Sequence, residues 1–341
     1  MKAVVFHAPG QVAVEDRPEP GIESPGDAIV KVSLAPVCGS DLVAYRGRSP
    51  GRRQPGITGH EFVGTISAVG DDVRRLQVGQ RVVSPFSVWC GGCFYCKQGL
   101  LSACERRAVF GLQLPGAQAE YVRVPNADAV LEALPDALSD DKAAFLSHIL
   151  TGVYGGLRQA GVKAGDSIAV VGCGPTGLAT ILMARAMGAG LIFALDHHNY
   201  RLGVAESLGA RALGEDAQAV LLAATGNRGA DIAVEAVGRV EALMRASDLT
   251  RPWGTLLSLS FGMEDDAGFP IGRLAQRRVR FLPAYGPAVK NYMAPVINML
   301  SRGIIDPSPL VSHTLPLSDA PRAYELLHER TDGVLRIVLQ P

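Results

Sequence analysis

The chain has 341 residues, roughly two domains at about 150 residues per domain. Lysine and arginine together number 33, as do aspartate and glutamate, so the formal charge at pH 7 is zero. This balance argues against nucleic acid or an anionic membrane surface as a partner. Hydrophobic residues make up 48% of the chain and charged residues 19%, which excludes intrinsic disorder as a description of the whole.

No segment has the pattern of a targeting signal or a membrane span. The apolar run from Met1 to His7 is too short for a signal peptide. The longest apolar stretch, residues 167–195, contains Arg185 and a cluster of glycines, so we do not expect it to cross a membrane. We therefore expect a cytoplasmic protein in a reducing environment.

The first 145 or so residues have the texture of a mostly β domain. Short valine-rich segments, such as 28–32, 64–70 and 79–83, are separated by glycine and proline. Such segments are typical of strands joined by turns, and helical periodicity is weak throughout this part.

From Asp140 onward, apolar strand-like segments alternate with helical ones. Strands are predicted at 168–171, 191–195, 231–235 and 254–258, and helices at 176–187, 201–208 and 240–246. This alternation predicts βαβ units and a parallel sheet covered on both faces. The chain then returns to mixed character, with a predicted helix at 288–302 and a closing strand at 334–339, so we expect domain limits near 148 and 284.

Four of the six cysteines fall within fifteen residues. A secreted disulfide protein usually spreads its cysteines along a short chain, so the clustering favours a metal site. Four thiolates suit a closed, structural zinc site, and two glycines between the first two cysteines permit the required turn. An iron–sulfur cluster or unligated thiols are the alternatives. The four residues are Cys90, Cys93, Cys96 and Cys104.

A glycine-rich segment follows the predicted strand 168–171 and opens the next helix. Its pattern fits the dinucleotide-binding loop, in which the first glycine makes the turn, the second admits the pyrophosphate and the third lets helix and strand pack closely. The helix N-terminus faces the phosphate charge. Asp196, at the end of the next strand, would accept bonds from the ribose hydroxyls and repel a 2′-phosphate, which favours NAD over NADP, although nearby Arg201 and two histidines soften that preference. The loop residues are Gly172, Gly174, Pro175, Thr176 and Gly177.

Two further motifs lie in the β domain, Cys38-Gly-Ser-Asp41 and Gly59-His60-Glu61. Together with the cysteine cluster, the glycine-rich loop and the segment 313–317, they make the chain resemble the zinc-dependent medium-chain alcohol dehydrogenases over essentially its whole length. The resemblance implies a GroES-like catalytic domain over 1–148, to which 285–341 return, and a Rossmann NAD-binding domain over 149–284.

The resemblance also implies a catalytic zinc ion, so we expect two zinc ions per chain. Its ligands would be Cys38 and His60 and, at the position six residues before an aromatic, His148. The family more commonly has cysteine or aspartate at that third position, but imidazole is a good zinc ligand. Glu61 matches the acid that approaches the metal during ligand exchange.

Ser40 matches the proton-relay position of the family, and Asp41 would fix the tautomer of the histidine ligand. Where some members end the relay with histidine, this chain has Val43. Phe86 and Trp89 are predicted to line the substrate pocket, with packing beneath the cysteine lobe as the alternative.

The expected reaction is hydride transfer between NAD and a primary or secondary alcohol, with the aldehyde or ketone as the oxidised partner. A polyol, sugar, amino-alcohol or formaldehyde dehydrogenase on the same scaffold is the alternative. A non-catalytic zinc- and nucleotide-binding protein is more remote. The resemblance implies a homodimer or homotetramer.

Overall fold

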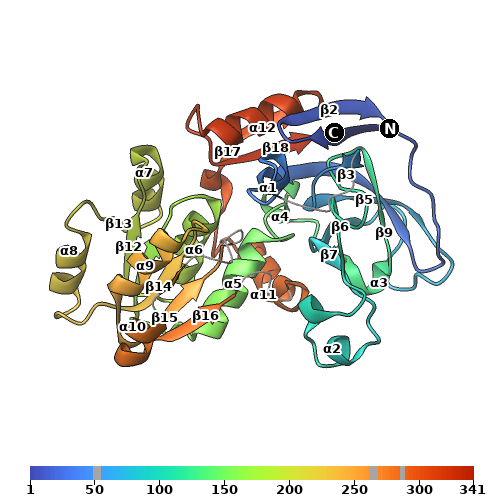
Figure 1. The fold of residues 1–341 in the computed structure, drawn as a ribbon. Coiled ribbons are helices and arrows are strands. Elements are labelled where there is room, and N and C mark those ends of the chain that lie inside the picture. Colours follow the sequence, from blue (N-terminus) through green and yellow to red (C-terminus); the bar gives the residue numbers. More distant parts are fainter. Residues whose placement is uncertain (49–54, 261–267, 270, 285–288) are drawn as a thin grey trace. The chain divides into compact units, whose positions relative to one another are not determined.

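The computed structural model describes residues 1–48, 55–260, 268–269, 271–284 and 289–341 (Figure 1). The predicted return of the chain at residue 285 and the predicted helix start at 288 lie outside these residues. The chain divides into two compact units. Unit 1 comprises Met1–Thr151, Ala288–Gly303 and Val311–Pro341, and unit 2 comprises Gly152–Pro287 and Ile304–Leu310.

Unit 1 is mostly β structure, as the valine-rich segments predict, and its strand pairs are antiparallel except for one parallel pair near the end of the chain. A seven-stranded sheet has the spatial order β10 (Glu132–Ala133), β6 (Arg81–Ser84), β5 (Phe62–Val69), β3 (Ala28–Val37), β18 (Arg336–Gln340) and β17 (Val311–Pro316), and β9 (Tyr121–Val124) also pairs with β3. A three-stranded sheet joins β2 (Gln11–Asp16), β1 (Lys2–Ala8) and β4 (Gly56–Ile57). The pair β7 (Ser87–Val88) and β8 (Ala108–Val109) leads to and from the cysteine lobe.

Helices in unit 1 are mostly short and connect these strands. They are α1 (Asp41–Tyr45), α2 (Phe94–Lys97), α3 (Ala127–Val130), α4 (Asp140–Ala143), α11 (Lys290–Ser301) and α12 (Ala320–Glu329), with 3₁₀ turns η1 (Leu101–Ala103) and η3 (Leu317–Asp319). Helix α12 packs against β2, β17 and β18. Its buried Ala323 and Tyr324 join a core cluster with Ile337 and Leu339 of β18.

Unit 2 has one six-stranded sheet, and every strand pair in it is parallel. Its spatial order is β13 (Arg211–Ala212), β12 (Leu191–Leu195), β11 (Ser167–Val171), β14 (Ala230–Glu235), β15 (Thr250–Ser258) and β16 (Arg280–Pro283). Counted along the chain, this order is 3-2-1-4-5-6, that of a dinucleotide-binding Rossmann domain. The predicted fold class, a Rossmann domain plus a mostly β domain, is confirmed.

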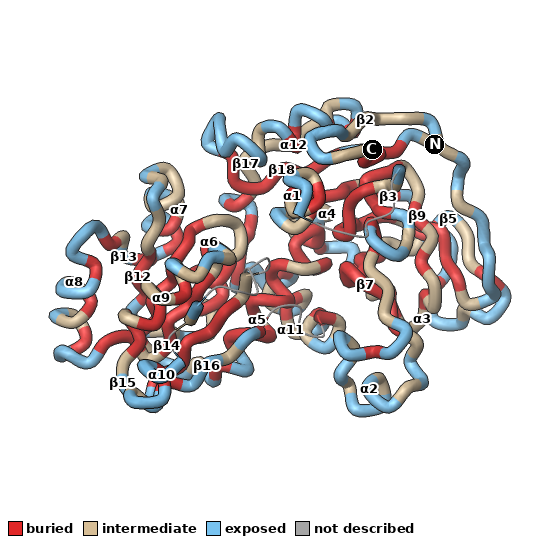
Figure 2. Tube along the Cα trace, in the orientation of Figure 1, coloured by how far each residue is buried: buried red, intermediate tan, exposed pale blue. Residues whose placement is uncertain are grey.

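Because helices cover this sheet, its middle strands are buried: β11 is buried along its whole length, and β14 is almost entirely buried, as Figure 2 shows for β14. Two contacts illustrate the packing: α6 lies against β11 and β12, and α9 lies against β11, β14 and β15. The helices are α5 (Ile149–Ala160, beginning in unit 1), α6 (Pro175–Ala186), α7 (Asn199–Ser207), α8 (Ala217–Ala224), α9 (Val240–Leu249) and α10 (Ile271–Arg277), with the turn η2 (Ser308–Leu310). Within the described part of the chain, no helix is long and apolar enough to cross a membrane.

Candidate metal centres and dinucleotide site

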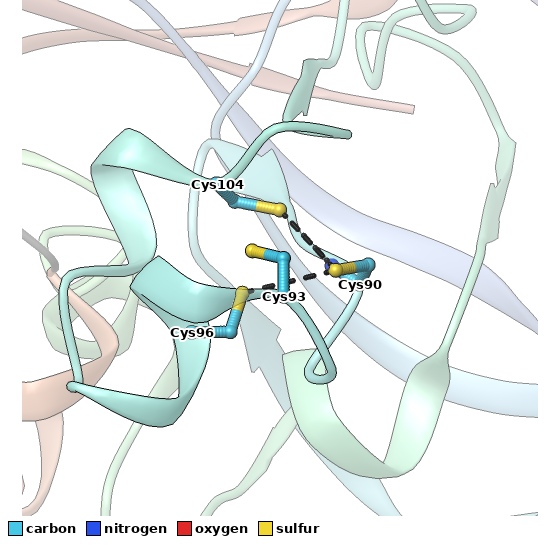
Figure 3. A group of neighbouring side chains, drawn as sticks. All are labelled: Cys90, Cys93, Cys96 and Cys104. Atoms are coloured by element: carbon cyan, nitrogen blue, oxygen red, sulfur yellow. Dashed lines mark hydrogen bonds between the residues drawn. The ribbon is translucent and has the colours of Figure 1, made fainter.

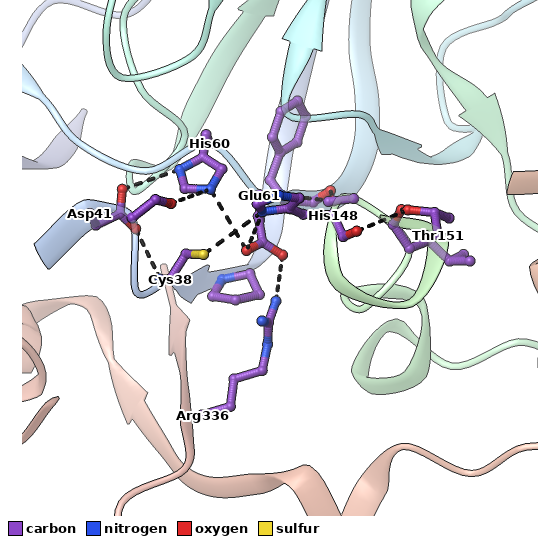
Figure 4. A network of polar contacts seen from close by, with 12 residues as sticks. Cys38, Asp41, His60, Glu61, His148, Thr151 and Arg336 are labelled. Atoms are coloured by element: carbon purple, nitrogen blue, oxygen red, sulfur yellow. Dashed lines mark hydrogen bonds and ion pairs between the residues drawn. The ribbon is translucent and has the colours of Figure 1, made fainter. Parts of the chain in front are cut away.

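The ends of three strands in unit 1 bring one set of predicted residues together. β3 and β5 run antiparallel, so the residue after β3, Cys38, lies beside the two residues before β5, His60 and Glu61. β18 begins next to the end of β3, which adds Arg336 to the same corner. Figure 4 shows these side chains pointing toward one another.

His148 is held in this corner by hydrogen bonds of its neighbour in the chain, Ser147. The Ser147 hydroxyl accepts the Phe62 backbone N–H at 3.3 Å and lies 3.2 Å from the Phe62 carbonyl, to which it donates. His148 is thereby held against the start of β5. The ligand atoms of Cys38, His60, Glu61 and His148 all lie within 4.8 Å of one another.

The spacing of these atoms fits a tetrahedral zinc ion. Bonds of about 2.3 Å to sulfur and about 2.0–2.1 Å to nitrogen separate the two ligand atoms by roughly 3.5 Å. Cys38 Sγ and His148 Nδ1 are 3.8 Å apart. Glu61 Oε1 lies 3.7 Å from the same nitrogen, is fully buried, and has no hydrogen-bond partner among the described residues. An unpartnered buried carboxylate oxygen facing thiol and imidazole groups is the environment a cation would complete.

Asp41 holds the His60 ring in place. Its Oδ1 lies 3.2 Å from His60 Nδ1, and its Oδ2 accepts the backbone N–H of Cys38 at 3.0 Å. Ser40 Oγ lies 3.2 Å from His60 Nε2, on the other side of the ring. Burial lowers the pKa of His60, but the nearby Asp41 charge and its hydrogen bond outweigh burial and raise the pKa well above its usual value.

The Glu61 carboxylate forms a buried ion pair that was not predicted from the sequence. Arg336 Nη2 donates to Glu61 Oε2 at 2.5 Å, and the exposed fractions of the two side chains are 1% and 0%. The guanidinium also lies 4.8 Å from the centroid of the Phe145 ring. An arginine inside an otherwise apolar closing strand was the available signal, because a charge is rarely buried unless it is paired.

These contacts stabilise the anionic forms of the thiol and the carboxyl group. Burial and the Glu61 charge raise the pKa of Cys38, but hydrogen bonds to His148 and His60 outweigh them and lower it to about 6. Burial lowers the pKa of His148, yet the neighbouring Cys38 and Glu61 groups raise it to about 9. Although burial opposes ionisation of Glu61, the Arg336 charge holds its pKa well below the usual range.

The two aromatic residues predicted for the substrate pocket occupy different places. The Phe86 ring lies 4.6 Å from that of His148, centroid to centroid, and packs edge-on against His60 at 6.3 Å. Trp89 lies in the hydrophobic core of unit 1 that packs against the lobe cysteines, and its carbonyl accepts the Asn126 side-chain amide at 2.9 Å. Phe86 thus borders the Cys38 group, whereas Trp89 occupies the packing position.

The four clustered cysteines face one another across a short lobe (Figure 3). Cys90 Sγ is 4.0 Å from Cys96 Sγ and 3.6 Å from Cys104 Sγ. A tetrahedral zinc ion with Zn–S bonds of about 2.3 Å separates its sulfurs by roughly 3.8 Å, so the spacing fits. Gly91 has a φ of +72°, the left-handed conformation that the turn between the first two cysteines requires.

The lobe environment also fits a cation. Backbone N–H groups of Gly92 and Cys93 lower the pKa of Cys90 to about 6. In contrast, burial and the neighbouring thiols of Cys93 and Cys104 raise the pKa of Cys96 to about 12. Four thiols this close cannot all ionise without a positive ion to balance them, and all six cysteines of the chain are free of disulfides.

In unit 2 the glycine-rich loop has the predicted geometry. Gly172 has a φ of +94° and makes the turn out of β11. A Cβ on Gly177 would lie 1.8 Å from the Gly172 carbonyl oxygen, so only glycine lets α6 pack this closely. At Gly174, by contrast, the nearest atom to such a Cβ is Arg201 Nη1 at 4.0 Å, which leaves the backbone open to a ligand. Pro175 and Thr176 form the first turn of α6, where phosphate charge is favoured.

Asp196 lies beside this loop with both oxygens engaged. Oδ2 accepts the Cys173 backbone N–H at 2.7 Å and lies 3.9 Å from Arg201 Nη1, while Oδ1 accepts the His198 backbone N–H and contacts its ring Nδ1, both at 2.9 Å. Burial raises the pKa of Asp196, but these bonds outweigh it and lower the pKa. A carboxylate offers about four acceptor positions, so a ribose hydroxyl would share or displace the His198 ring contact.

Two family models match the chain. The alcohol dehydrogenase GroES-like domain matches residues 24–136, and the zinc-binding dehydrogenase domain matches residues 175–302. A zinc-type alcohol dehydrogenase-like protein of Bacillus subtilis, AdhB, is 34% identical, and the match covers 100% of both chains. The chain therefore belongs to the zinc-dependent medium-chain alcohol dehydrogenase family.

Solved structures agree with this assignment. The alcohol dehydrogenase TADH from Thermus sp. ATN1 superposes with a TM-score of 0.94 at 38% identity, covering 100% of this chain and 99% of that one. The alcohol dehydrogenase RspB of Escherichia coli CFT073, solved with NADH, gives 0.90 at 27% identity. A protein of Sinorhizobium meliloti 1021 classed as a zinc-binding dehydrogenase, solved with NADP, gives 0.88 at 26% identity, and both matches cover 100% of this chain and 99% of the other.

Proposed function

We propose that this chain transfers a hydride between NAD and a primary or secondary alcohol, with the aldehyde or ketone as the oxidised partner. The observation that carries the proposal is the buried group of Cys38, His60, Glu61 and His148, whose ligand atoms lie within 4.8 Å of one another. The similarity to alcohol dehydrogenases over the full length of the chain supports the reaction class.

Cys38, His60 and His148 would hold a catalytic zinc ion, and Glu61 Oε1 would be a further ligand during ligand exchange. Zinc held there supplies Lewis-acid chemistry, which lowers the pKa of an alcohol hydroxyl toward neutrality. An ion held by only three protein ligands would be able to bind the substrate oxygen as well. One thiolate with two imidazoles contributes less negative charge than two thiolates, so this ligand set favours strong polarisation.

The surrounding residues orient the ligands and move the proton. Asp41 accepts from His60 Nδ1–H and so leaves the Nε2 lone pair facing the cluster. Ser40 Oγ would accept the proton of the substrate hydroxyl while passing on its own hydroxyl proton. Because Val43 occupies the position of the histidine found in some relatives, that proton would leave by the cofactor ribose and water or by another group. Phe86 keeps water from the rings of the two histidines.

The loop of unit 2 would bind the cofactor. The N-terminus of α6 and the open backbone at Gly174 would hold the pyrophosphate, with Arg201 beside it. Asp196 would accept from the adenosine ribose, which favours NAD over NADP. The bound nicotinamide supplies the hydride acceptor.

A second, structural zinc ion would be held by the four lobe cysteines, two zinc ions per chain in all.

A substrate panel combined with metal analysis tests the proposal. Purified protein is assayed with primary and secondary alcohols, polyols and formaldehyde, each with NAD and with NADP, while zinc is quantified by mass spectrometry. We expect about two zinc ions per chain and turnover with NAD. One zinc ion per chain and no turnover with any substrate would favour a non-catalytic zinc- and nucleotide-binding protein instead.

The ligand role of His148 has its own test. His148→Ala should remove about one zinc ion per chain and nearly all activity, because two protein ligands bind zinc weakly. His313→Ala is the matched control, since that ring pairs with Asp332 at 3.1 Å and belongs to neither metal group. Full zinc content and activity in His148→Ala would overturn the assignment.

The cofactor preference depends on Asp196. Asp196→Gly should lower the ratio of kcat/KM for NAD to that for NADP by about 10- to 100-fold, the equivalent of a lost hydrogen bond to a charged group of about 1.5–3 kcal/mol. The ratio corrects for any loss of folded protein. An unchanged ratio would show that Asp196 does not contact the ribose.

We further propose that the protein works in the cytoplasm as a homodimer or homotetramer, by analogy with the family that it resembles. Light scattering on the purified protein tests the assembly, and a mass of one chain would contradict it.

A further inference from the structure

Gln118, just before β9, joins two parts of unit 1 through a buried amide. Its exposed fraction is 0%. The amide oxygen accepts from the Tyr324 hydroxyl at 2.8 Å and from the Thr58 hydroxyl. The amide nitrogen donates to the Pro36 carbonyl and to Asp41 Oδ2, both at 3.4 Å. Every polar atom of the side chain is therefore engaged.

The direction in which this amide points follows from its partners. A carbonyl and a carboxylate can only accept, so the nitrogen must face Pro36 and Asp41. The oxygen must then face the two hydroxyl groups, which can donate. Gly59 provides the room, because a Cβ at that position would lie 2.4 Å from Gln118 Cγ and 2.8 Å from its backbone nitrogen. The side chain therefore has a single arrangement that satisfies all of its neighbours.

The Gln118–Asp41 contact matters because Asp41 also contacts His60 and Cys38. One Asp41 oxygen faces His60 Nδ1 at 3.2 Å, while the other accepts the Cys38 N–H at 3.0 Å and the Gln118 amide. At 3.4 Å the amide contact is long for a hydrogen bond, so its effect is mainly on the orientation of the carboxylate. Asp41 is 5% exposed, so water would have little access to donate to it in place of the Gln118 amide.

We propose that Gln118 is a positioning residue for the catalytic zinc site: it fixes the rotation of the Asp41 carboxylate and, through it, the ring of His60. The inference rests on the proposed function, since it assumes that Cys38, His60 and His148 bind zinc. Removing an outer partner of a metal-ligating histidine typically costs 10- to 100-fold in affinity. Gln118 contacts His60 only through Asp41, so we expect a loss near the lower limit of this range, about 10-fold.

Gln118→Glu replaces the amide donor with a carboxyl oxygen. It preserves the side-chain length and an acceptor for Tyr324 and Thr58, but it presents an oxygen to Asp41 in place of the amide N–H. We expect release of the catalytic zinc to a chromogenic chelator to become about 10-fold faster. The lobe zinc, bound by four cysteines with no contact to Gln118 among the described residues, should leave at the wild-type rate.

Two further variants separate positioning from general stability. Tyr324→Phe removes a buried hydrogen bond from the same amide but leaves the donor to Asp41 in place, so zinc release should stay near the wild-type rate even if Tm falls. Gln118→Met keeps the volume and removes the donor without adding charge. Gln118→Met should also accelerate zinc release, and it provides the test of positioning if Gln118→Glu does not fold.

The readouts distinguish this inference from the proposed function. His148→Ala, which should retain only the lobe zinc, supplies the reference trace for that ion. Cobalt substitution should also shift the visible ligand-field bands in Gln118→Glu but not in Tyr324→Phe. Zinc release within threefold of wild type in both Gln118 variants, or equal acceleration in Tyr324→Phe, would overturn the positioning role. A wild-type protein with only the lobe zinc would instead overturn the proposed function.

Discussion

Removing one partner of the buried ion pair between Arg336 and Glu61 should strongly destabilise unit 1. The perturbation is Arg336→Met, which fills a similar volume without charge. Because Glu61 is 0% exposed, its carboxylate would be left inside the protein without its cation. The second single variant is Glu61→Met, and the double variant removes both charges.

The magnitude follows from the geometry. The donor and acceptor atoms are 2.5 Å apart, and both side chains are almost completely excluded from water. Removing one partner of such a pair typically costs about 3–5 kcal/mol. Two unit charges about 4 Å apart interact by about 4 kcal/mol at an effective dielectric constant of about 20, which is the same range. Glu61→Met should cost less than Arg336→Met, since the guanidinium retains the Phe145 ring at 4.8 Å.

Replacing both charges removes the uncompensated ion, and such replacements are often close to neutral. The double variant should therefore be more stable than Arg336→Met alone, with a coupling energy of at least about 2 kcal/mol. The chain offers a convenient probe, because it has two tryptophans, one in each unit. In a Trp253→Phe background, the fluorescence of buried Trp89 reports the guanidinium-induced unfolding of unit 1 alone.

Two results would refute this reasoning. One is unfolding of Arg336→Met at the same denaturant concentration as its parent, which would mean that the charge of Glu61 is compensated elsewhere. The other is a double variant in which the costs of the two single variants simply add, which would mean that the two charges do not interact.

Two further predictions concern unit 2. Gly177→Ala should destabilise unit 2 and abolish NAD binding, because the new Cβ would lie 1.8 Å from the Gly172 carbonyl oxygen. The control is Gly203→Ala, where no atom lies within 4 Å of the new Cβ; calorimetry should show it to be neutral or slightly stabilising. Burial raises the pKa of Asp231, but hydrogen bonds from Ser167 and Arg251 outweigh it and lower the pKa. The stabilisation is therefore complete above the unfolded-state pKa near 4 and lost as pH falls through the folded-state value. Asp231→Asn should flatten the dependence of Tm on pH below about 4, and an unchanged slope would contradict this account.

Much of unit 2 could be predicted from sequence, because its signals are local. The strand 191–195 was predicted with the limits that it has, while β11 differs from the prediction by one residue at its start and α6 by one residue at each end. The glycine pattern depends on backbone geometry within one turn, so Gly172 and Gly177 could be interpreted without knowing the rest of the fold.

Helix and strand limits in the β domain and near the end of the chain were predicted less well. β3 extends to Val37, five residues beyond its predicted end, and the closing strand begins at Arg336 rather than at residue 334. Both limits depend on pairing between β3 and β18, whose partners are distant in the chain. Such pairing leaves little trace in a short window of sequence.

The amino-acid sequence by itself determined which residues could serve as metal ligands and where the nucleotide loop begins, because cysteine spacing and glycine turns are properties of short segments. Only the tertiary structure decided which buried partners surround those residues. Arg336 meets Glu61 across 275 positions and Gln118 meets Asp41 across 77, contacts set by strand order and register. Strand register depends on the burial of whole sheets, so no local pattern records it.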